Sequence, residues 1–229
     1  MGTKGVNYNI FVVNSSFSFK GDKMSQYFEN SNLPSNIREY ETRILGETFK
    51  FKTDNGVFSK DKLDFGTRVM LESIPIKELS GDILDLGCGY GVVGIVLSKL
   101  CNVNIDAVDV NKRALHLCDL NCKLNNIKGI NYLESYCYQA INDKQYDYII
   151  TNPPIRAGKE VVYEMLKGAK DHLKKDGILY FVMRKDHGAK TAIKDISNIY
   201  NTEIISKEKG FFVIKCFLRW QLEIFMLII

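Results

Sequence analysis

The sequence has few of the residues that build metal or disulfide sites. It contains only three histidines, His116, His172 and His187, which lie far apart and lack the spacing of metal ligands. Its six cysteines include no CxxC pair, so we expect no metal and six reduced thiols. Because reduced cysteines are usual inside cells, this composition predicts a cytoplasmic protein.

The chain also lacks an apolar run long enough to cross a membrane. Residues 220–229 are strongly apolar, but the segment is about half the length that a membrane-spanning helix needs. Residues 10–13 are too few for the hydrophobic region of a secretory signal, and no small-residue cleavage site follows them. We therefore expect no membrane association. The net charge of +4 is mild, so it permits a polyanionic partner without indicating one.

Strand and helix patterns alternate from Gly81 to about Lys215. Runs rich in β-forming residues predict seven strands, over residues 82–86, 104–108, 130–133, 146–150, 178–183, 202–205 and 211–214. Helical patterns follow the first, second, fourth and fifth of these strands, over residues 92–100, 111–125, 159–173 and 191–200. This order predicts an α/β fold: a Rossmann-like, doubly wound, mostly parallel seven-stranded sheet with a C-terminal antiparallel hairpin.

Acidic residues and glycines lie where the first two predicted strands end. The stretch DLGCGYG places Asp85 before Gly87, Gly89 and Gly91, and such glycines let the backbone turn sharply and approach a ligand closely. Asp109 ends the second strand, where a carboxylate can accept hydrogen bonds from both hydroxyls of a ribose. Because ligands of parallel sheets bind beyond these strand ends, the pattern predicts a cofactor that contains a nucleoside.

The same window contains GYGVVG, a formal dinucleotide motif, so NAD is an alternative cofactor. A lone GxGxxG is a weak signal. Asp85 would repel a pyrophosphate at the helix N-terminus but suits a ligand that carries an ammonium group. S-adenosylmethionine has an ammonium and a sulfonium group and no phosphate, so the sequence favours it over NAD. The structural alternatives are a tight turn without a ligand and, for Asp109, a helix cap.

The stretch TNPPI follows the fourth strand of the predicted sheet. Pro153 and Pro154 lack a backbone N–H and fix φ, so they end the strand in a rigid turn. We expect this turn to hold Asn152 beside the cofactor loop, because the fourth strand neighbours the first. The amide oxygen and a backbone carbonyl of the turn can then accept both hydrogens of an exocyclic amine and orient its lone pair. The alternative is a turn that only ends the strand.

These motifs together resemble a known enzyme family. DLGCGYG followed by NPPI is similar to the class I S-adenosylmethionine-dependent methyltransferases, whose Asn-Pro-Pro-aromatic motif methylates exocyclic amines. The earlier segments DNGVFS and DFGT resemble the small-domain, RsmC-like group, which modifies N2 of guanine in small-subunit ribosomal RNA. The resemblance covers roughly Tyr40 to Lys215. It implies rRNA methylation, with 16S ribosomal RNA or the small ribosomal subunit as partner.

The resemblance also implies a set of site residues. The catalytic motif would be Asn152, Pro153, Pro154 and Ile155. The cofactor pocket would be formed by Phe58, Ser59, Asp64, Gly66, Thr67, Asp85, Gly87, Gly89, Gly91, Asp109, Val110, Glu134, Ser135 and Asn152. Within this set, either Glu134 or Ser135 would contact the adenine. Ile155 stands where the family usually has an aromatic residue that stacks on the flipped base, so stacking must come from elsewhere or be weaker.

Several alternatives remain open on the sequence. Arg156, Lys159, Arg184 and Lys185 lie near the same strand ends, either as solvated surface charges or as phosphate contacts to RNA. Amino methylation of DNA adenine or of protein glutamine uses related motifs. A catalytically silent module that binds RNA or the cofactor is the alternative from another class of protein.

The sequence predicts one methyltransferase domain over residues 40–217. Residues 40–80 would form its N-terminal subregion and residues 81–217 its Rossmann-like core. We expect residues 1–39 to be a partly disordered N-terminal extension. Residues 218–229 would be an apolar tail, to which the sequence assigns no role.

Overall fold

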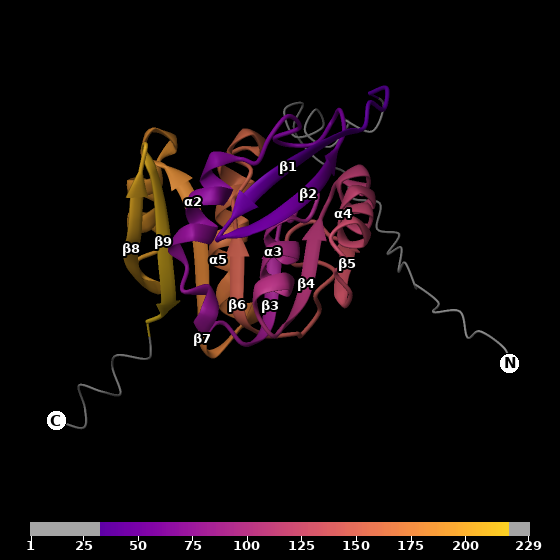
Figure 1. The fold of residues 1–229 in the computed structure, drawn as a ribbon. Coiled ribbons are helices and arrows are strands. Elements are labelled where there is room, and N and C mark those ends of the chain that lie inside the picture. Colours follow the sequence, from indigo (N-terminus) through magenta and orange to yellow (C-terminus); the bar gives the residue numbers. More distant parts are fainter. Residues whose placement is uncertain (1–32, 220–229) are drawn as a thin grey trace, which may run out of the picture.

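The computed structural model describes residues 33–219, so most of the predicted extension and of the apolar tail lies outside the described residues. Its centre is a seven-stranded sheet in the order β5-β4-β3-β6-β7-β9-β8 (Figure 1). The strands are β3 (Gly81–Leu86), β4 (Val103–Asp109), β5 (Ile130–Glu134), β6 (Tyr146–Thr151), β7 (Leu173–Arg184), β8 (Tyr200–Glu208) and β9 (Phe211–Leu218). The five strands from β5 to β7 in this sheet order pair in parallel. Strand β9 pairs antiparallel with β7 and with β8, and this arrangement confirms the predicted fold.

Helices cover both faces of the sheet. The helices are α2 (Phe65–Ser73), α3 (Val92–Leu100), α4 (Lys112–Leu124), α5 (Lys159–His172) and α6 (Ala189–Asp195). Buried side chains of α2, α3 and α4 share one hydrophobic core with one face, and those of α5 and α6 share a second core with the other. Asn111 caps α4: its Oδ1 accepts hydrogen bonds from the backbone N–H groups of Arg113 and Ala114 at 3.0 and 3.3 Å.

Two predicted boundaries are wrong by five residues, and β8 and β9 extend beyond their predicted ends. Strand β7 begins at Leu173 and not at Ile178, because Leu173 already pairs with Tyr146 before a register shift in β6. Helix α6 ends at Asp195, five residues before the predicted end. There the Ser197 hydroxyl and its N–H both bond the carbonyl of Lys194, which closes the last turn before β8 starts.

Residues upstream of the sheet form a hairpin of β1 (Arg38–Ile44) and β2 (Glu47–Thr53) that docks on α4 (Figure 1). Asn121 accepts a hydrogen bond from the backbone N–H of Lys52 at 2.6 Å and donates one to its carbonyl at 2.9 Å. Asn125 makes the same pair of bonds with Lys50, at 3.1 and 2.7 Å. A side-chain amide carries one acceptor and two donors, so the two asparagines replace a neighbouring strand along the edge of β2.

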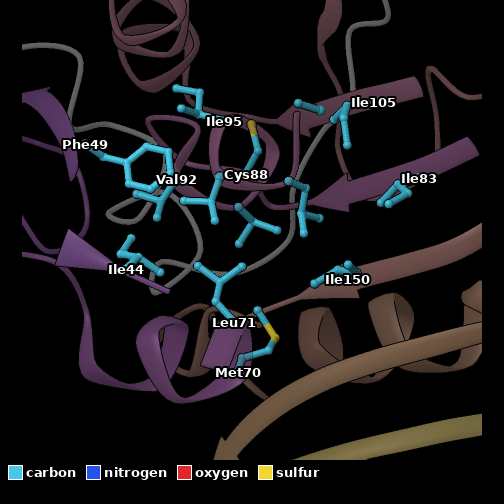
Figure 2. Packing of buried hydrophobic residues seen from close by; sticks show 14 of the residues in the cluster. Ile44, Phe49, Met70, Leu71, Ile83, Cys88, Val92, Ile95, Ile105 and Ile150 are labelled. Atoms are coloured by element: carbon cyan, nitrogen blue, oxygen red, sulfur yellow. The ribbon is translucent and has the colours of Figure 1, made fainter. Parts of the chain in front are cut away.

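The hairpin and α2 share a core with the sheet. Figure 2 shows Ile44 and Phe49 of the hairpin, Leu71 of α2 and Ile83 and Ile150 of the sheet gathered in one cluster. All five side chains are fully buried. This shared core is what the proposed single domain over residues 40–217 requires.

The structure also describes the state of the cysteines and the length of the helices. All six cysteines are free thiols. Within residues 33–219, no helix is both long and apolar enough to span a bilayer.

Candidate active site

The carboxyl ends of β3, β4, β6 and β7 open into a cavity of about 320 Å³. It is closed on one side by residues before and within the first turn of α2. The structure brings together fourteen of the predicted site residues in its lining: Phe58, Ser59, Asp64, Thr67, Asp85, Gly87, Gly89, Asp109, Val110, Ser135, Asn152, Pro153, Pro154 and Ile155.

Three predicted cofactor residues, Gly66, Gly91 and Glu134, lie outside this lining. Gly91 has φ +91°, and a Cβ built on it would lie 2.5 Å from the sulfur of Cys118, so it serves the turn into α3. The Glu134 carboxylate is half exposed and pairs with the ammonium of Lys112 at 3.4 Å. Of the two residues considered for the adenine, only Ser135 therefore borders the cavity.

Asp85 combines a structural contact with a place in the cavity wall. Its side chain is 2% exposed, and its Oδ2 accepts a hydrogen bond from the backbone N–H of Gly94 at 3.0 Å, in the first turn of α3. Burial raises the pKa of Asp85 to about 7, the bond from Gly94 opposes that rise, and the nearby Asp109 carboxylate adds to it. A cationic group bound against Asp85 would favour the ionised carboxylate.

Asp109 ties the glycine loop to the start of α4. Its Oδ2 accepts from the backbone N–H of Gly89 and its Oδ1 from that of Asn111, both at 2.8 Å. Burial raises the pKa of Asp109 above its ordinary value, and these backbone hydrogen bonds lower it. Because each carboxylate oxygen has a second lone pair, Asp109 can still accept hydrogen bonds from a ligand.

The amide of Asn152 is held in one orientation. Its Nδ2 donates hydrogen bonds to Asp64 Oδ2 at 2.9 Å and to Thr67 Oγ1 at 3.0 Å. Asp64 is also the N-cap of α2 and accepts from the backbone N–H of Thr67 at 2.8 Å. Both amide hydrogens are used, while Oδ1 has no hydrogen-bond partner within residues 33–219. The arrangement leaves an amide oxygen free beside the glycine loop.

Sequence reasoning missed part of the cavity wall. Met183, His187 and Phe211 also line it, beside Arg184, which was already expected near these strand ends. The antiparallel register pairs Arg184 with Phe211, so the first residue of β9 returns to the edge where β7 ends. Phe211 is the first residue of the second predicted hairpin strand, directly after Gly210, and this position could have placed it at this edge.

The four basic residues near the strand ends separate into two groups. Arg156 and Arg184 line the cavity, and Lys159 and Lys185 do not. The guanidinium of Arg184 makes two hydrogen bonds to the carboxylate of Asp186, both at 2.9 Å. The ammonium of Lys159 lies 3.6 Å from the carboxylate of Asp195.

Comparison with known proteins assigns the chain to a family. Residues 48–215 match the family described as methyltransferase small domain. The chain belongs to this family. It is thereby an S-adenosylmethionine-dependent methyltransferase of the RsmC-like group, as the motifs predicted.

Its relatives differ in how much of their length the chain covers. It is 37% identical over 192 residues to uncharacterized protein YbxB of Bacillus subtilis (strain 168), covering 82% of this chain and 96% of the relative. It is 30% identical over 198 residues to ribosomal RNA small subunit methyltransferase C of Colwellia psychrerythraea (strain 34H), covering 84% of this chain and 53% of the relative.

A solved structure has the same fold. The T. thermophilus 16S rRNA N2 G1207 methyltransferase, in complex with AdoMet and guanosine, matches with a TM-score of 0.72 at 24% identity. The match covers 82% of this chain and 52% of that one. This chain therefore spans nearly all of the Bacillus relative but about half of each of these two rRNA methyltransferases.

The cavity fits S-adenosylmethionine, the cofactor of this methyltransferase family. Gly87 and Gly89 have φ of +74° and +55°, and nothing lies within 4 Å of a Cβ built on Gly89, so bare backbone borders open space there. The Asp85 carboxylate suits the ammonium group of the cofactor, and Asp109 suits its ribose hydroxyls. Ser135 and Val110 border the same part of the cavity.

Proposed function

We propose that this methyltransferase methylates the exocyclic N2 amine of a guanine in 16S (small-subunit) ribosomal RNA. The observation that carries the proposal is the free Oδ1 of Asn152, held beside the glycine loop by Asp64 and Thr67. The named function of the Colwellia relative, and that of the Thermus protein with the same fold, support the choice of small-subunit rRNA and, for the latter, of guanine N2.

Asn152 would act by positioning the amine. Its Oδ1 accepts one hydrogen of the exocyclic amine. The carbonyls of Pro154 and Ile155 each accept a turn hydrogen bond, from Ala157 and Gly158, at 2.9 and 3.3 Å, and we assign the second hydrogen to the carbonyl of Pro153, which follows Asn152 directly. Two acceptors in fixed positions direct the lone pair of the nitrogen away from the turn and toward the glycine loop.

The chemistry needs no base before transfer. The bound S-adenosylmethionine supplies an electrophilic methyl group on its sulfonium. A neutral amide cannot take up a proton, so Asn152 orients the amine and the methylated nitrogen loses its proton to water. Preorganised hydrogen-bond acceptors also stabilise the positive charge that develops on the amine.

Asp85 and Asp109 would hold the cofactor, each with a structural contact that fixes its carboxylate. The hydrogen bond from Gly94 fixes Asp85 against α3, and the bonds from Gly89 and Asn111 fix Asp109 against the loop. Groups that are already ordered lose little conformational entropy when the ligand binds. Phe58, Ser59, Asp64 and Thr67 would close the pocket from the N-terminal side.

A methyl-transfer assay with tritiated cofactor tests this proposal. The purified protein is incubated with 16S rRNA, with assembled small subunits, with DNA and with protein extract, and Asn152→Ala serves as the blank. The proposal predicts label in RNA, recovered as N2-methylguanosine after digestion to nucleosides. Label only in adenine of DNA or only in protein would overturn the RNA proposal, and binding of cofactor without any transfer would identify a silent module.

A further inference from the structure

The substrate side of the cavity lacks an aromatic residue where the family motif normally provides one. Ile155 occupies that position, and an isoleucine offers no planar face to a base. We propose that Phe211 and Arg184 form the surface on which the target base stacks. This inference rests on the proposed function, because it specifies how the same site binds a flipped nucleobase.

The strand order places this pair on the far side of Asn152 from the cofactor loop. Asp85 and Asp109 lie at the carboxyl ends of β3 and β4, and Asn152 follows β6. Arg184 ends β7 on the other side of β6, and Phe211 starts β9 next to it. With the cofactor over β3 and β4, a base whose amine meets Asn152 must extend over the ends of β7 and β9.

The pair is held in position by its neighbours. The Cζ of Arg184 lies 5.3 Å from the ring centroid of Phe211, and Asp186 fixes the plane of the guanidinium with two hydrogen bonds. The ring of Phe65 lies 5.6 Å from that of Phe211, inclined by 59°. A Cβ built on Gly66 would lie 2.8 Å from the Phe211 ring. Gly66 does not line the cavity, but its lack of a side chain makes room for this ring.

The other aromatic residues of the cavity wall are committed elsewhere. The hydroxyl of Tyr90 is 2.9 Å from that of Tyr40, and its ring is buried in the core. Tyr136 follows β5, at the cofactor end of the sheet, and donates a hydrogen bond to Glu164 at 2.8 Å. Phe58 is 61% exposed and lies two residues after Gly56, whose carbonyl is bonded by Asn111 at the start of α4.

Among the described phenylalanine and tyrosine residues of the cavity wall, only Phe211 therefore lies on the substrate side, where the guanidinium of Arg184 and the imidazole of His187 also border the cavity. Aromatic rings and guanidinium planes both stack on unpaired bases, and this stacking is tolerant of base identity. The inferred ligand is a planar nucleobase turned out of an RNA strand, with the choice of amine left to Asn152 and the Pro153 carbonyl.

A fluorescence experiment tests the stacking surface without relying on turnover. Phe211→Trp places an indole in the surface, and Phe65→Trp is the matched control, because Phe65 packs on Phe211 but does not line the cavity. Guanosine 5′-monophosphate is titrated into each variant with S-adenosylhomocysteine at saturation, so that the nucleotide cannot enter the cofactor half. Saturable quenching in Phe211→Trp and none in Phe65→Trp is expected. Equal or absent quenching in both variants would overturn the inference.

The KM for RNA gives an independent test, with substitutions that leave the backbone of the sheet unchanged. Arg184→Gln lies at the surface of the fold, and we expect it to raise the KM for 16S rRNA several-fold while the cofactor Kd stays within two-fold. Phe211→Leu should raise that KM by about ten-fold, since one base stack contributes this order of affinity. An unchanged KM in both folded variants would refute the stacking surface while leaving RNA methylation intact. Conversely, selective quenching by a protein that methylates no RNA would refute the proposed function and keep the stacking surface.

Discussion

The hydrogen bond between Thr67 and Asn152 permits a sharp test of the positioning mechanism. Thr67→Val replaces the hydroxyl with a methyl group of similar size and removes the 3.0 Å contact from Asn152 Nδ2 to Oγ1. The cap of α2 is preserved, because Asp64 accepts from the backbone N–H of residue 67. The substitution therefore weakens the hold on the amide without removing the helix start or the amide itself.

The size of the expected effect follows from the contact that is lost. A neutral hydrogen bond contributes about 0.5–1.5 kcal/mol, which corresponds to roughly a two- to ten-fold lower turnover when the amide spends less time correctly oriented. Asp64 still accepts from Asn152 at 2.9 Å, so the loss should be partial. Asn152→Ala removes the acceptor altogether and should lower turnover by roughly a hundred-fold or more, with cofactor binding nearly intact.

The assay is single-turnover methyl transfer at saturating cofactor and RNA, with cofactor Kd measured by calorimetry. Thr67→Ser keeps a hydroxyl and is the matched control, expected to remain near the wild-type rate. In the Asn152→Ala background, Thr67→Val should have no further effect, because the amide that it positions is gone. Full activity of Thr67→Val, or an equal loss of rate in both backgrounds, would refute the reasoning.

Three other substitutions test the remaining parts of the site and its support. Asp109→Ala should weaken cofactor binding by roughly ten-fold or more in calorimetry, with a smaller effect on the saturated rate. The pKa of Asp85 is about 7 in the folded protein and about 4 in the unfolded chain. Its contribution to stability is therefore fully present below pH 4 and is lost as the pH rises through about 7. Between about pH 4 and pH 7, the free energy of unfolding in urea should therefore fall by a few kcal/mol more in the wild type than in Asp85→Asn. The wild type should also bind the cofactor more tightly at pH 8 than at pH 6. Asn121→Ala leaves the backbone of Lys52 without its buried partners and should lower the free energy of unfolding by roughly 2–4 kcal/mol, against a small change for the exposed Asn102→Ala.

The sequence predicted those elements that local patterns determine. Helix α3 has the predicted bounds, Val92–Leu100, because a continuous apolar stretch follows a glycine turn and packs on the sheet. The start of β7 was missed, because pairing between Leu173 and Tyr146 decides it, and these residues are separated by a whole helix. Local propensity cannot report such a tertiary contact.

The site shows the same division. Asp85, the glycine loop and Asp109 stand out because each lies at the end of a predicted strand in a recognisable motif. The bond from Asn152 to Asp64 joins residues 88 positions apart, and the wall formed by Phe211 depends on antiparallel register. The first leaves no local signal and the second leaves only the position of Phe211 after a hairpin turn, so the orientation of the amide and the stacking surface required the structure.

Mass-spectrometric mapping of ribosomal RNA from a strain that lacks this protein tests the central claim most directly. The account predicts the loss of one N2-methylguanosine from 16S rRNA, with all other modified nucleosides unchanged. Expression of the wild-type chain should restore that nucleoside, and the Asn152→Ala chain, produced at the same level, should not. An unchanged set of N2-methylguanosines in 16S rRNA, or restoration by Asn152→Ala, would contradict the account.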